Sequence, residues 1–368
     1  MASVEDIALT LIPRLGPKGI AHLLDLFCSA EKIFSATSDE LARQGTLHPD
    51  IIEHIRRKTT FQAAEREIKY CWHHTITPVA STDENYPALL RETLDYPHVL
   101  YVMGNPEVLR KNHLTMVGTR RMTPYGQQIA EKLISDLETH SSETAIVSGL
   151  AFGIDTACHR AALAYGIPTI GVVASVLPEI TPAQHTAIAR DMIEHGGAII
   201  SELHSQTKQN GRYYLARNRI LAGMSAGTVV VESPVNGGSL STALMADSYN
   251  RTVMAVPGRL TDNMSFGCNA LIRNRKAQMI LSAEDIVREL MWDLSRPEEP
   301  TKPQSALSVE LSRDEAELLA CFHTGDPISV EELGNATGRS VQELSVLLFG
   351  LEMSGAIRQI PGNRYIRL

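Results

Sequence analysis

The sequence is short of cysteine, of long apolar runs and of basic residues, and each shortage excludes a class of protein. Its apolar runs all stay below the roughly 18 residues that a membrane-spanning helix needs, so we expect no membrane partner. The N-terminal MASVEDIALT carries acids and no basic start, which argues against a secretory signal. Scattered cysteines, odd in number and never spaced as CxxC, argue against disulfides and structural zinc (Cys28, Cys71, Cys158, Cys268, Cys321). We therefore expect a reduced, cytoplasmic protein.

Basic residues are outnumbered, with 34 Lys and Arg against 42 Asp and Glu, for a net charge of −8. This balance argues against nucleic-acid binding, because affinity for DNA is dominated by its phosphate backbone. The average hides two windows without any acid, residues 203–231 and 263–282. Their basic residues are Lys208, Arg212, Arg217, Arg219, Arg273, Arg275 and Lys276. A local basic surface therefore remains open.

The pattern along the 368 residues indicates several domains. From about residue 96 to 290, short β-rich runs alternate with helical stretches, which predicts an α/β fold with a parallel, doubly wound sheet. The runs are VLYVM, LTMVG, AIVSG, TIGVVA, GAIISE, GTVVVE, TVMAVPG and QMIL, and their continuous apolar character fits burial on both faces. The predicted parts are a helical domain (1–78), the α/β domain (79–294), a linker (295–305) and a small C-terminal domain (306–368).

The two flanking domains have patterns of their own. The C-terminal segment predicts helices over Arg313–His323, from Ser329 and over Ser340–Ser354, followed by strands AIRQI and RYIRL separated by PGN. That order is typical of a winged helix. Its third helix has two glutamates and no basic residue, which favours protein contact over duplex DNA. Near the N-terminus, IPRLGPKGIAHLLDLF resembles a helix-hairpin-helix in which Arg14 and Lys18 could assist a phosphate, or is a tight turn between packed helices.

The stretch MVGTRRMTPYG predicts a strand end, a glycine turn and a helix that begins near Tyr125. In open α/β sheets ligands sit beyond the carboxyl ends of the strands, where a helix N-terminus offers N–H groups to an anion. Thr119 could add a hydroxyl, and Arg120 or Arg121 a guanidinium. The alternative is that Gly118 only makes a tight turn. GxxxxGK[ST] and GxGxxG are both missing, which disfavours P-loop ATP hydrolysis and ordinary NAD binding.

SGLAFGID repeats the strand–glycine–helix pattern. Ser148, Asp155 and His159 could be read as a hydrolytic triad, but an Asp–His pair four residues apart is more often helix support. The GxSxG motif that exposes a serine nucleophile is also missing.

Two further stretches suit single-stranded nucleic acid. RYYLARNRIL places Tyr213 and Tyr214 before Arg217, Asn218 and Arg219, so that rings could stack on bases while cations neutralise phosphates. A basic helix face with tyrosines in the core is the alternative. SPVNGGSLSTALMA forms another backbone-rich loop that leads into a helix, with Gly237, Gly238, Ser239, Ser241 and Thr242.

The ordered set GTRRMTPYG, SGLAFGID, ARNRILAGMS, NGGSLSTA, AVPG and GCNALI resembles the DNA-processing protein A (DprA, also called Smf) family, over roughly residues 80–290. The resemblance implies an extended Rossmann-like fold that binds single-stranded DNA. It also implies a homodimer that loads the RecA recombinase onto incoming DNA during natural transformation, with single-strand-binding protein as a further partner. It implies no enzyme activity, catalytic residue, metal or cofactor.

The family's binding motifs fall on residues of this chain. Its Gly-Ser-Arg turn corresponds to Gly118, Thr119 and Arg120, and its Arg-Asn-Arg segment to Arg217, Asn218 and Arg219. Tyr214 stands at the aromatic position, and the glycine-rich loop falls on Gly237, Gly238 and Ser239, with Thr242 in the helix that follows. Two positions depart from the family pattern: Phe152 replaces an arginine and Leu215 replaces a proline.

Two other functions compete with this one. The central fold also resembles nucleotide-sugar phosphoribohydrolases of the lysine-decarboxylase-like fold, which carry PGGxGTxxE. The comparable NGGSLSTALMA has Leu244 and Met245 where that chemistry needs an acid. A scaffold that holds only proteins would have no need of Arg120, Arg217 and Arg219. We therefore favour a single-stranded DNA-binding recombination mediator.

Overall fold

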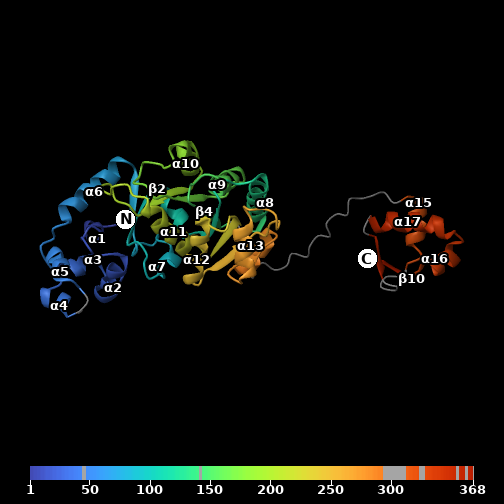
Figure 1. Ribbon diagram of the computed structural model, residues 1–368, viewed down its shortest axis with the longest axis horizontal. Coiled ribbons are helices and arrows are strands. Elements are labelled where there is room, and N and C mark those ends of the chain that lie inside the picture. Colours follow the sequence, from blue (N-terminus) through green and yellow to red (C-terminus); the bar gives the residue numbers. More distant parts are fainter. Residues whose placement is uncertain are drawn as a thin grey trace. The chain divides into compact units, whose positions relative to one another are not determined.

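The chain divides into two compact units, residues 1–294 and 295–368. The computed structural model, drawn in Figure 1, describes residues 1–43, 47–140, 143–292, 312–322, 328–353, 356–360 and 364–367. Within these ranges, no helix is both long enough and apolar enough to cross a membrane.

Short helices precede the sheet, and side-chain caps mark where several of them begin. Ser3 and Thr37 each exchange hydrogen bonds with the acid three residues further on, which starts one helix apiece. The buried faces of these helices share a core cluster with Tyr101 and Leu150 of the α/β region, so both regions belong to one unit. The helices are α1 (Val4–Thr10), α2 (Pro17–Phe27), α3 (Ala30–Ser35), α4 (Ser38–Ala42), α5 (Pro49–Arg56) and α6 (Phe61–His73).

The described residues of the first unit form a nine-stranded sheet in the order β1-β2-β6-β5-β4-β3-β7-β8-β9. Strands β3 to β9 pair in parallel, whereas β2 is antiparallel to β6 and β1 is antiparallel to β2. The strands are β1 (Ile76–Ala80), β2 (Val99–Gly104), β3 (Asn112–Gly118), β4 (Thr144–Ser148), β5 (Thr169–Val172), β6 (Ala198–Ser201), β7 (Gly227–Glu232), β8 (Thr252–Ala255) and β9 (Gln278–Met279).

This sheet confirms the predicted α/β fold, and every predicted apolar run contains a strand. The predicted parallel sheet is confirmed from β3 to β9, and β1 and β2 extend it at one edge as antiparallel strands. ITPVA, the segment that forms β1, was not predicted as a strand, and it crosses the boundary drawn at residue 78. The four-part division of the chain remains a prediction.

Helices cover both faces of the sheet, as Figure 1 shows. On one face α8 (Pro124–His140), α9 (Ile154–Ala164) and α14 (Ala283–Glu289) pack through one buried cluster. A second cluster joins the other face to α11 (Arg212–Met224), α12 (Gly238–Ser248) and α13 (Phe266–Arg273). The remaining helices of this region are α7 (Ala88–Arg91), α10 (Thr186–Glu194) and two 3₁₀ turns, Pro106–Arg110 and Ala183–His185.

The direction in which the sheet is built reverses at β3. From β3 the chain adds β4, β5 and β6 on one side, and then returns through α11 to place β7 on the other side of β3. The loops that leave β3 and β7 therefore diverge to opposite faces, and a crevice opens between them at the carboxyl ends of the strands. The sequence motifs fall at this point.

The second unit has the predicted winged-helix order. It contains α15 (Arg313–Leu319), α16 (Val330–Thr337) and α17 (Val341–Met353), and the hairpin strands β11 (Ile357–Ile360) and β12 (Arg364–Arg367). A short strand that was not predicted, β10 (Ile328–Ser329), pairs with β12 to make the sheet order β10-β12-β11. The predicted PGN turn and His323 lie outside the described residues.

Candidate nucleic-acid interface

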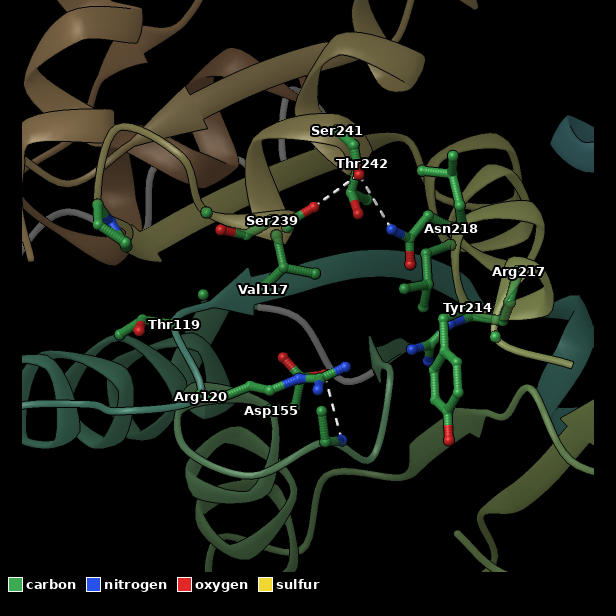
Figure 2. A pocket seen from close by; sticks show the side chains of 18 residues that line it. Val117, Thr119, Arg120, Asp155, Tyr214, Arg217, Asn218, Ser239, Ser241 and Thr242 are labelled. Atoms are coloured by element: carbon green, nitrogen blue, oxygen red, sulfur yellow. Dashed lines mark hydrogen bonds between the residues drawn. The ribbon is translucent and has the colours of Figure 1, made fainter. Parts of the chain in front are cut away.

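A pocket of about 380 Å³ lies at the carboxyl ends of β3, β4 and β7, where the sheet reverses direction. Figure 2 shows it from close by. Every predicted contact residue except Arg219 lines the pocket: Gly118, Thr119, Arg120, Tyr214, Arg217, Asn218, Gly237, Gly238, Ser239 and Thr242. Segments far apart in the sequence are therefore brought together.

The turn after β3, residues 118–123, is called the β3 turn below, and its backbone is fixed by its neighbours. A Cβ on Gly118 would lie 2.7 Å from Cβ of Ile154 and 2.8 Å from the carbonyl oxygen of Glu232, so only glycine fits. The Thr119 N–H donates to the Glu232 carbonyl at 2.7 Å, and the Thr119 carbonyl accepts from the Ile154 N–H at 3.1 Å. These contacts hold the turn in place and leave the Arg120 side chain exposed.

One prediction about the β3 turn was wrong. The sequence suggested that the helix after this turn offers free N–H groups to an anion, but a carboxylate of the protein already sits there. Glu232, which ends β7 and is 1% exposed, accepts from the Thr123 N–H at 2.9 Å and from the Thr123 hydroxyl at 2.7 Å. An acid at a helix N-terminus satisfies the same donors that a phosphate would use. The start of α8 is thus occupied from within.

The turn after β7, residues 233–238, is called the β7 turn below, and it leaves its helix start open. Gly237 is the N-cap of α12, and no side chain caps this helix. A Cβ on Gly238 would meet nothing within 4 Å, so the space beside the first turn of the helix is empty. First-turn N–H groups without an intrahelical partner and the positive end of the helix dipole both favour an anion. Of the two helix starts, that of α12 is therefore the one that suits an anion.

Side chains of α11 form the facing wall of the pocket. The guanidinium carbon of Arg120 lies 5.8 Å from the centre of the half-buried Tyr214 ring, within the range of a cation–π contact. Asn218 donates from Nδ2 to Oγ of Ser241 at 3.1 Å and so ties α11 to α12. Figure 2 shows Tyr214 and Asn218 on the α11 side of the pocket and Ser241 on the α12 side. An aromatic ring and a cation thus face a helix N-terminus.

Arg217 lies inside the wall of the pocket rather than at its surface. It is 6% exposed, and Nη1 donates to the carbonyl of Val172. Burial lowers the pKa of Arg217, and the neighbouring Asp155 carboxyl opposes that shift. Burial likewise raises the pKa of Asp155, against the effect of Arg217 and of the N–H groups of Gly149 and Ala151, which donate to Oδ2 at 3.1 and 3.3 Å. Of the arginines predicted to meet phosphate, Arg120 is therefore more accessible than Arg217.

Arg219 is the one predicted contact residue that the structure places elsewhere. Residues two apart on an α-helix point about 200° apart, so Arg217 and Arg219 cannot share a face of α11. Arg219 donates to Glu202 and lies 3.9 Å from Asp95, and its side chain is 11% exposed. Its charge is balanced by acids of the protein, away from the pocket lining.

The residues of the conceivable hydrolytic triad do not form a relay. The Ser148 hydroxyl donates to the carbonyl of Met116 at 2.6 Å. Nδ1 of His159 contacts Oγ1 of Thr169 at 2.7 Å, and burial lowers the pKa of His159 to about 3, so its ring is neutral at neutral pH. Within the described residues, no group of three or more His, Cys, Asp or Glu side chains could hold a metal ion. The geometry favours binding over either of these chemistries.

The role of Glu232 was missed in the sequence, although a signal for it was present. GTVVVE ends an apolar strand on an acid at the carboxyl edge of the sheet, where a buried carboxylate needs donors. The start of α8, which follows the neighbouring strand β3, supplies these donors. The pairing of β3 with β7 is long-range, however, and is not visible in a single sequence.

Models of known protein families match both units of this chain. The family model of DNA recombination-mediator protein A matches residues 77–291, and that of the DprA winged helix domain matches residues 299–363. Protein Smf of Escherichia coli K12 is 33% identical over 326 residues, which cover 86% of this chain and 84% of that protein. The DNA processing protein DprA of Streptococcus pneumoniae R6 is 37% identical over 207 residues, covering 56% of this chain and 72% of that one.

Solved structures agree with the sequence matches. The X-ray structure of DNA processing protein A from Streptococcus pneumoniae superposes with a TM-score of 0.67 at 28% identity, covering 78% of this chain and 98% of that one. A structure of the Helicobacter pylori protein, described for its single-stranded DNA binding mode, superposes with a TM-score of 0.53 at 29% identity, covering 60% and 98%. By sequence and by fold, this chain belongs to the DNA recombination-mediator protein A family.

Proposed function

We propose that the protein binds single-stranded DNA in the pocket at the carboxyl ends of β3, β4 and β7. The observation that carries the proposal is the meeting of an uncapped helix start, an exposed arginine and a tyrosine ring in one pocket. A phosphate suits the N-terminus of α12 and Arg120, and a base suits the face of Tyr214. A pocket of about 380 Å³ has room for a nucleotide of a single strand.

Several predicted residues that line the pocket take roles that follow from their positions. Arg120 neutralises phosphate from the exposed side, while the glycines of the β7 turn give the backbone of the strand access to N–H groups. Asn218 holds α11 to α12 through Ser241, Thr242 lines the pocket from α12, and Arg217 supplies a buried positive charge. Because these are backbone contacts and stacking, binding is largely independent of sequence.

The biological role is that of a recombination mediator without enzyme activity. Membership of the family supports a role in DNA processing, and the Helicobacter pylori relative is described as binding single-stranded DNA. In our proposal the protein loads RecA onto incoming single strands during natural transformation, in the cytoplasm and in the presence of single-strand-binding protein. RecA filament assembly on a strand coated with that protein, measured with and without this chain, tests this role.

We further propose that the protein acts as a homodimer. β9 is an edge strand of the sheet, and an exposed edge is a template for pairing with another chain. Beside it lies an apolar hollow of about 620 Å³, lined by Leu260, Phe266 and Met279. Leu260 is 86% and Met279 is 52% exposed. Met279→Lys should shift the molecular mass in sedimentation from that of a dimer to that of a monomer. A wild type that already sediments as a monomer would contradict the proposal.

The binding proposal is tested by fluorescence anisotropy of a labelled poly-dT strand and a duplex of equal length, across a series of salt concentrations. The wild type should prefer the single strand with a steep salt dependence. Arg120→Ala should weaken binding about tenfold, because a hydrogen bond to a charged group is lost. The slope of log K against log salt should fall by about 0.7, the value for one phosphate contact on a single strand.

Arg190→Ala is the matched control. Arg190 is an exposed arginine of α10 that does not line the pocket, so this variant changes net charge equally and should bind like the wild type. Equal losses in both variants would mean that only the overall charge matters. No binding by the wild type at low salt would sink the DNA function altogether.

A further inference from the structure

The turn after β4, residues 149–153, is called the β4 turn below, and it carries an exposed aromatic ring. Phe152 is 47% exposed, although a phenylalanine in a turn between a strand and a helix would normally be drawn into the core. Its neighbours Ala151 and Asp155 both line the DNA pocket. Phe152 itself is not a lining residue, but it lies between Ala151 and Asp155 in the sequence, so its backbone is next to the pocket lining.

The β4 turn is fastened to the β3 turn that carries Arg120. Gly153, with φ of +80°, packs its Cα against the carbonyl of Thr119, and a Cβ there would lie 2.7 Å from the carbonyl carbon of Arg120. The Ile154 N–H donates to the Thr119 carbonyl at 3.1 Å. The backbone of Phe152 is therefore one residue away from direct contact with the turn that presents the accessible cation of the pocket.

The ring of Phe152 is held by a second ring behind it. Its centroid lies 4.7 Å from that of His185, with the planes at 66°, an edge-to-face arrangement. His185 is 6% exposed, and Nδ1 contacts the carbonyl of Leu150 at 2.8 Å while Nε2 lies 3.3 Å from Oγ1 of Thr156. A fixed, buried imidazole thus contacts the phenyl ring, and about half of the Phe152 surface stays exposed to solvent.

We propose that Phe152 is a second stacking platform, on which a base of the bound strand lies as it leaves the pocket. This inference rests on the proposed function, since it extends the same single strand from Tyr214 over the rim at the β4 turn. A ring that is exposed, supported from behind and next to a phosphate-binding turn has the properties that base stacking requires. Stacking accepts any base, so Phe152 adds affinity without sequence preference.

The ring and the cation contribute in different ways, which makes the proposal testable. A phosphate contact releases counterions and appears in the salt slope, whereas stacking on a neutral ring does not. Phe152→Ala should therefore weaken binding of poly-dT about tenfold at every salt concentration, within the range known for one stacked base, and leave the slope unchanged. Phe152→Arg should instead steepen the slope by about 0.7.

An abasic strand of equal length separates stacking from charge directly, because it keeps the phosphates and lacks the bases. The ratio of affinities for poly-dT and for the abasic strand should fall about tenfold in Phe152→Ala. Phe152→Trp should keep or increase that ratio, and its added fluorescence should be quenched on binding poly-dT and not on binding the abasic strand. Leu94→Ala removes a 79% exposed side chain outside the pocket and is the control for lost apolar surface.

The outcomes distinguish this inference from the function on which it rests. If Phe152→Ala binds poly-dT like the wild type while Arg120→Ala loses affinity, stacking on Phe152 is disproved and the DNA pocket stands. If the wild type binds no single-stranded DNA at all, both fail. Because the side chain is exposed, the melting temperature of Phe152→Ala should match that of the wild type, so a binding defect would not reflect misfolding.

Discussion

The β3 turn and the β7 turn share a sequence pattern, an apolar strand followed by glycine and a helix, yet they differ in what fills the helix start. At the β3 turn the Glu232 carboxylate takes the Thr123 N–H and hydroxyl. At the β7 turn no side chain caps α12, and the space beside Gly238 is empty. The sequence pattern alone therefore predicts two helix starts that could bind an anion. The start of α8 is filled by a carboxylate from the neighbouring strand, and the start of α12 remains free for a ligand.

The largest change in stability should follow from removing the carboxylate of Glu232 at the start of α8. Glu232→Ala removes the acceptor of two partly buried donors on Thr123 and should lower the free energy of unfolding by about 3 kcal/mol. Urea denaturation followed by circular dichroism measures it. Glu232→Gln keeps one acceptor oxygen and should lose about half as much. If both variants are as stable as the wild type, the carboxylate does not cap α8.

A methyl group added to the β3 turn should also lower the free energy of unfolding. Gly118→Ala places Cβ within 2.7 Å of the Ile154 side chain and 2.8 Å of the Glu232 carbonyl, and this overpacking should cost about 2 kcal/mol. The same denaturation experiment reports it. Gly238→Ala is the matched change on the open turn, where nothing lies within 4 Å, and its stability should not fall. Equal losses at the two positions would remove the contrast between the turns.

His159, in the helix that follows the β4 turn, should affect the stability of the core behind the pocket without affecting DNA binding. The pKa of His159 is lowered to about 3 by burial, while an unfolded histidine has a pKa of about 6.5. Below pH 6.5 the unfolded chain takes up a proton on His159 that the folded protein does not. The contribution of this group to the free energy of unfolding is therefore complete above pH 6.5 and is lost as the pH falls toward 3, at about 1.4 kcal/mol per pH unit. At pH 5 the wild type should have lost about 2 kcal/mol through this group.

His159→Gln should flatten that acid dependence without altering DNA binding, because the residue contacts Thr169 and does not line the pocket. Denaturation at pH 7.5 and pH 5, compared between the two proteins, isolates the contribution of this group from that of the other titrating residues. An identical pH dependence in both proteins would mean that the pKa of His159 is the same in the folded and the unfolded state. A lost affinity for poly-dT would mean that core and pocket are coupled.

The smallest change in free energy should come from filling the open turn. Gly238→Val projects a side chain into empty space at the start of α12 and should weaken poly-dT binding about tenfold, or 1.4 kcal/mol, by keeping the phosphate from the helix. Its melting temperature should not fall. Unchanged affinity would mean that the strand does not approach α12.

The sequence predicted the elements well and located the segments that meet in the pocket, because both depend on local patterns. Each continuous apolar run became a strand, and the glycine turns fell at the reversal point of the sheet, where parallel topology brings them together. β1 was missed because ITPVA contains a proline and has little apolar length, so its strand conformation depends on pairing with β2.

The rest depended on long-range pairing or on helical rotation. Glu232 reaches Thr123 only because β7 lies next to β3, and no local pattern states that neighbourhood. Arg217 and Arg219 looked equivalent in the sequence, yet helix geometry turns them to opposite sides of α11, one toward Asp155 and the other toward Glu202. The Arg-Asn-Arg motif located the segment in the sequence, but the different surroundings of its two arginines became visible only in the fold.

The most direct test of this account is a crystal structure of the protein with a short poly-dT strand. We predict a phosphate group at the N-terminus of α12, within hydrogen-bond distance of the backbone N–H groups of Gly238 and Ser239, with Arg120 on its exposed side. The start of α8 should still hold the Glu232 carboxylate. A phosphate bound at α8 with Glu232 displaced, or a strand that bypasses the pocket, would contradict the central claim that the open turn is the one that binds DNA.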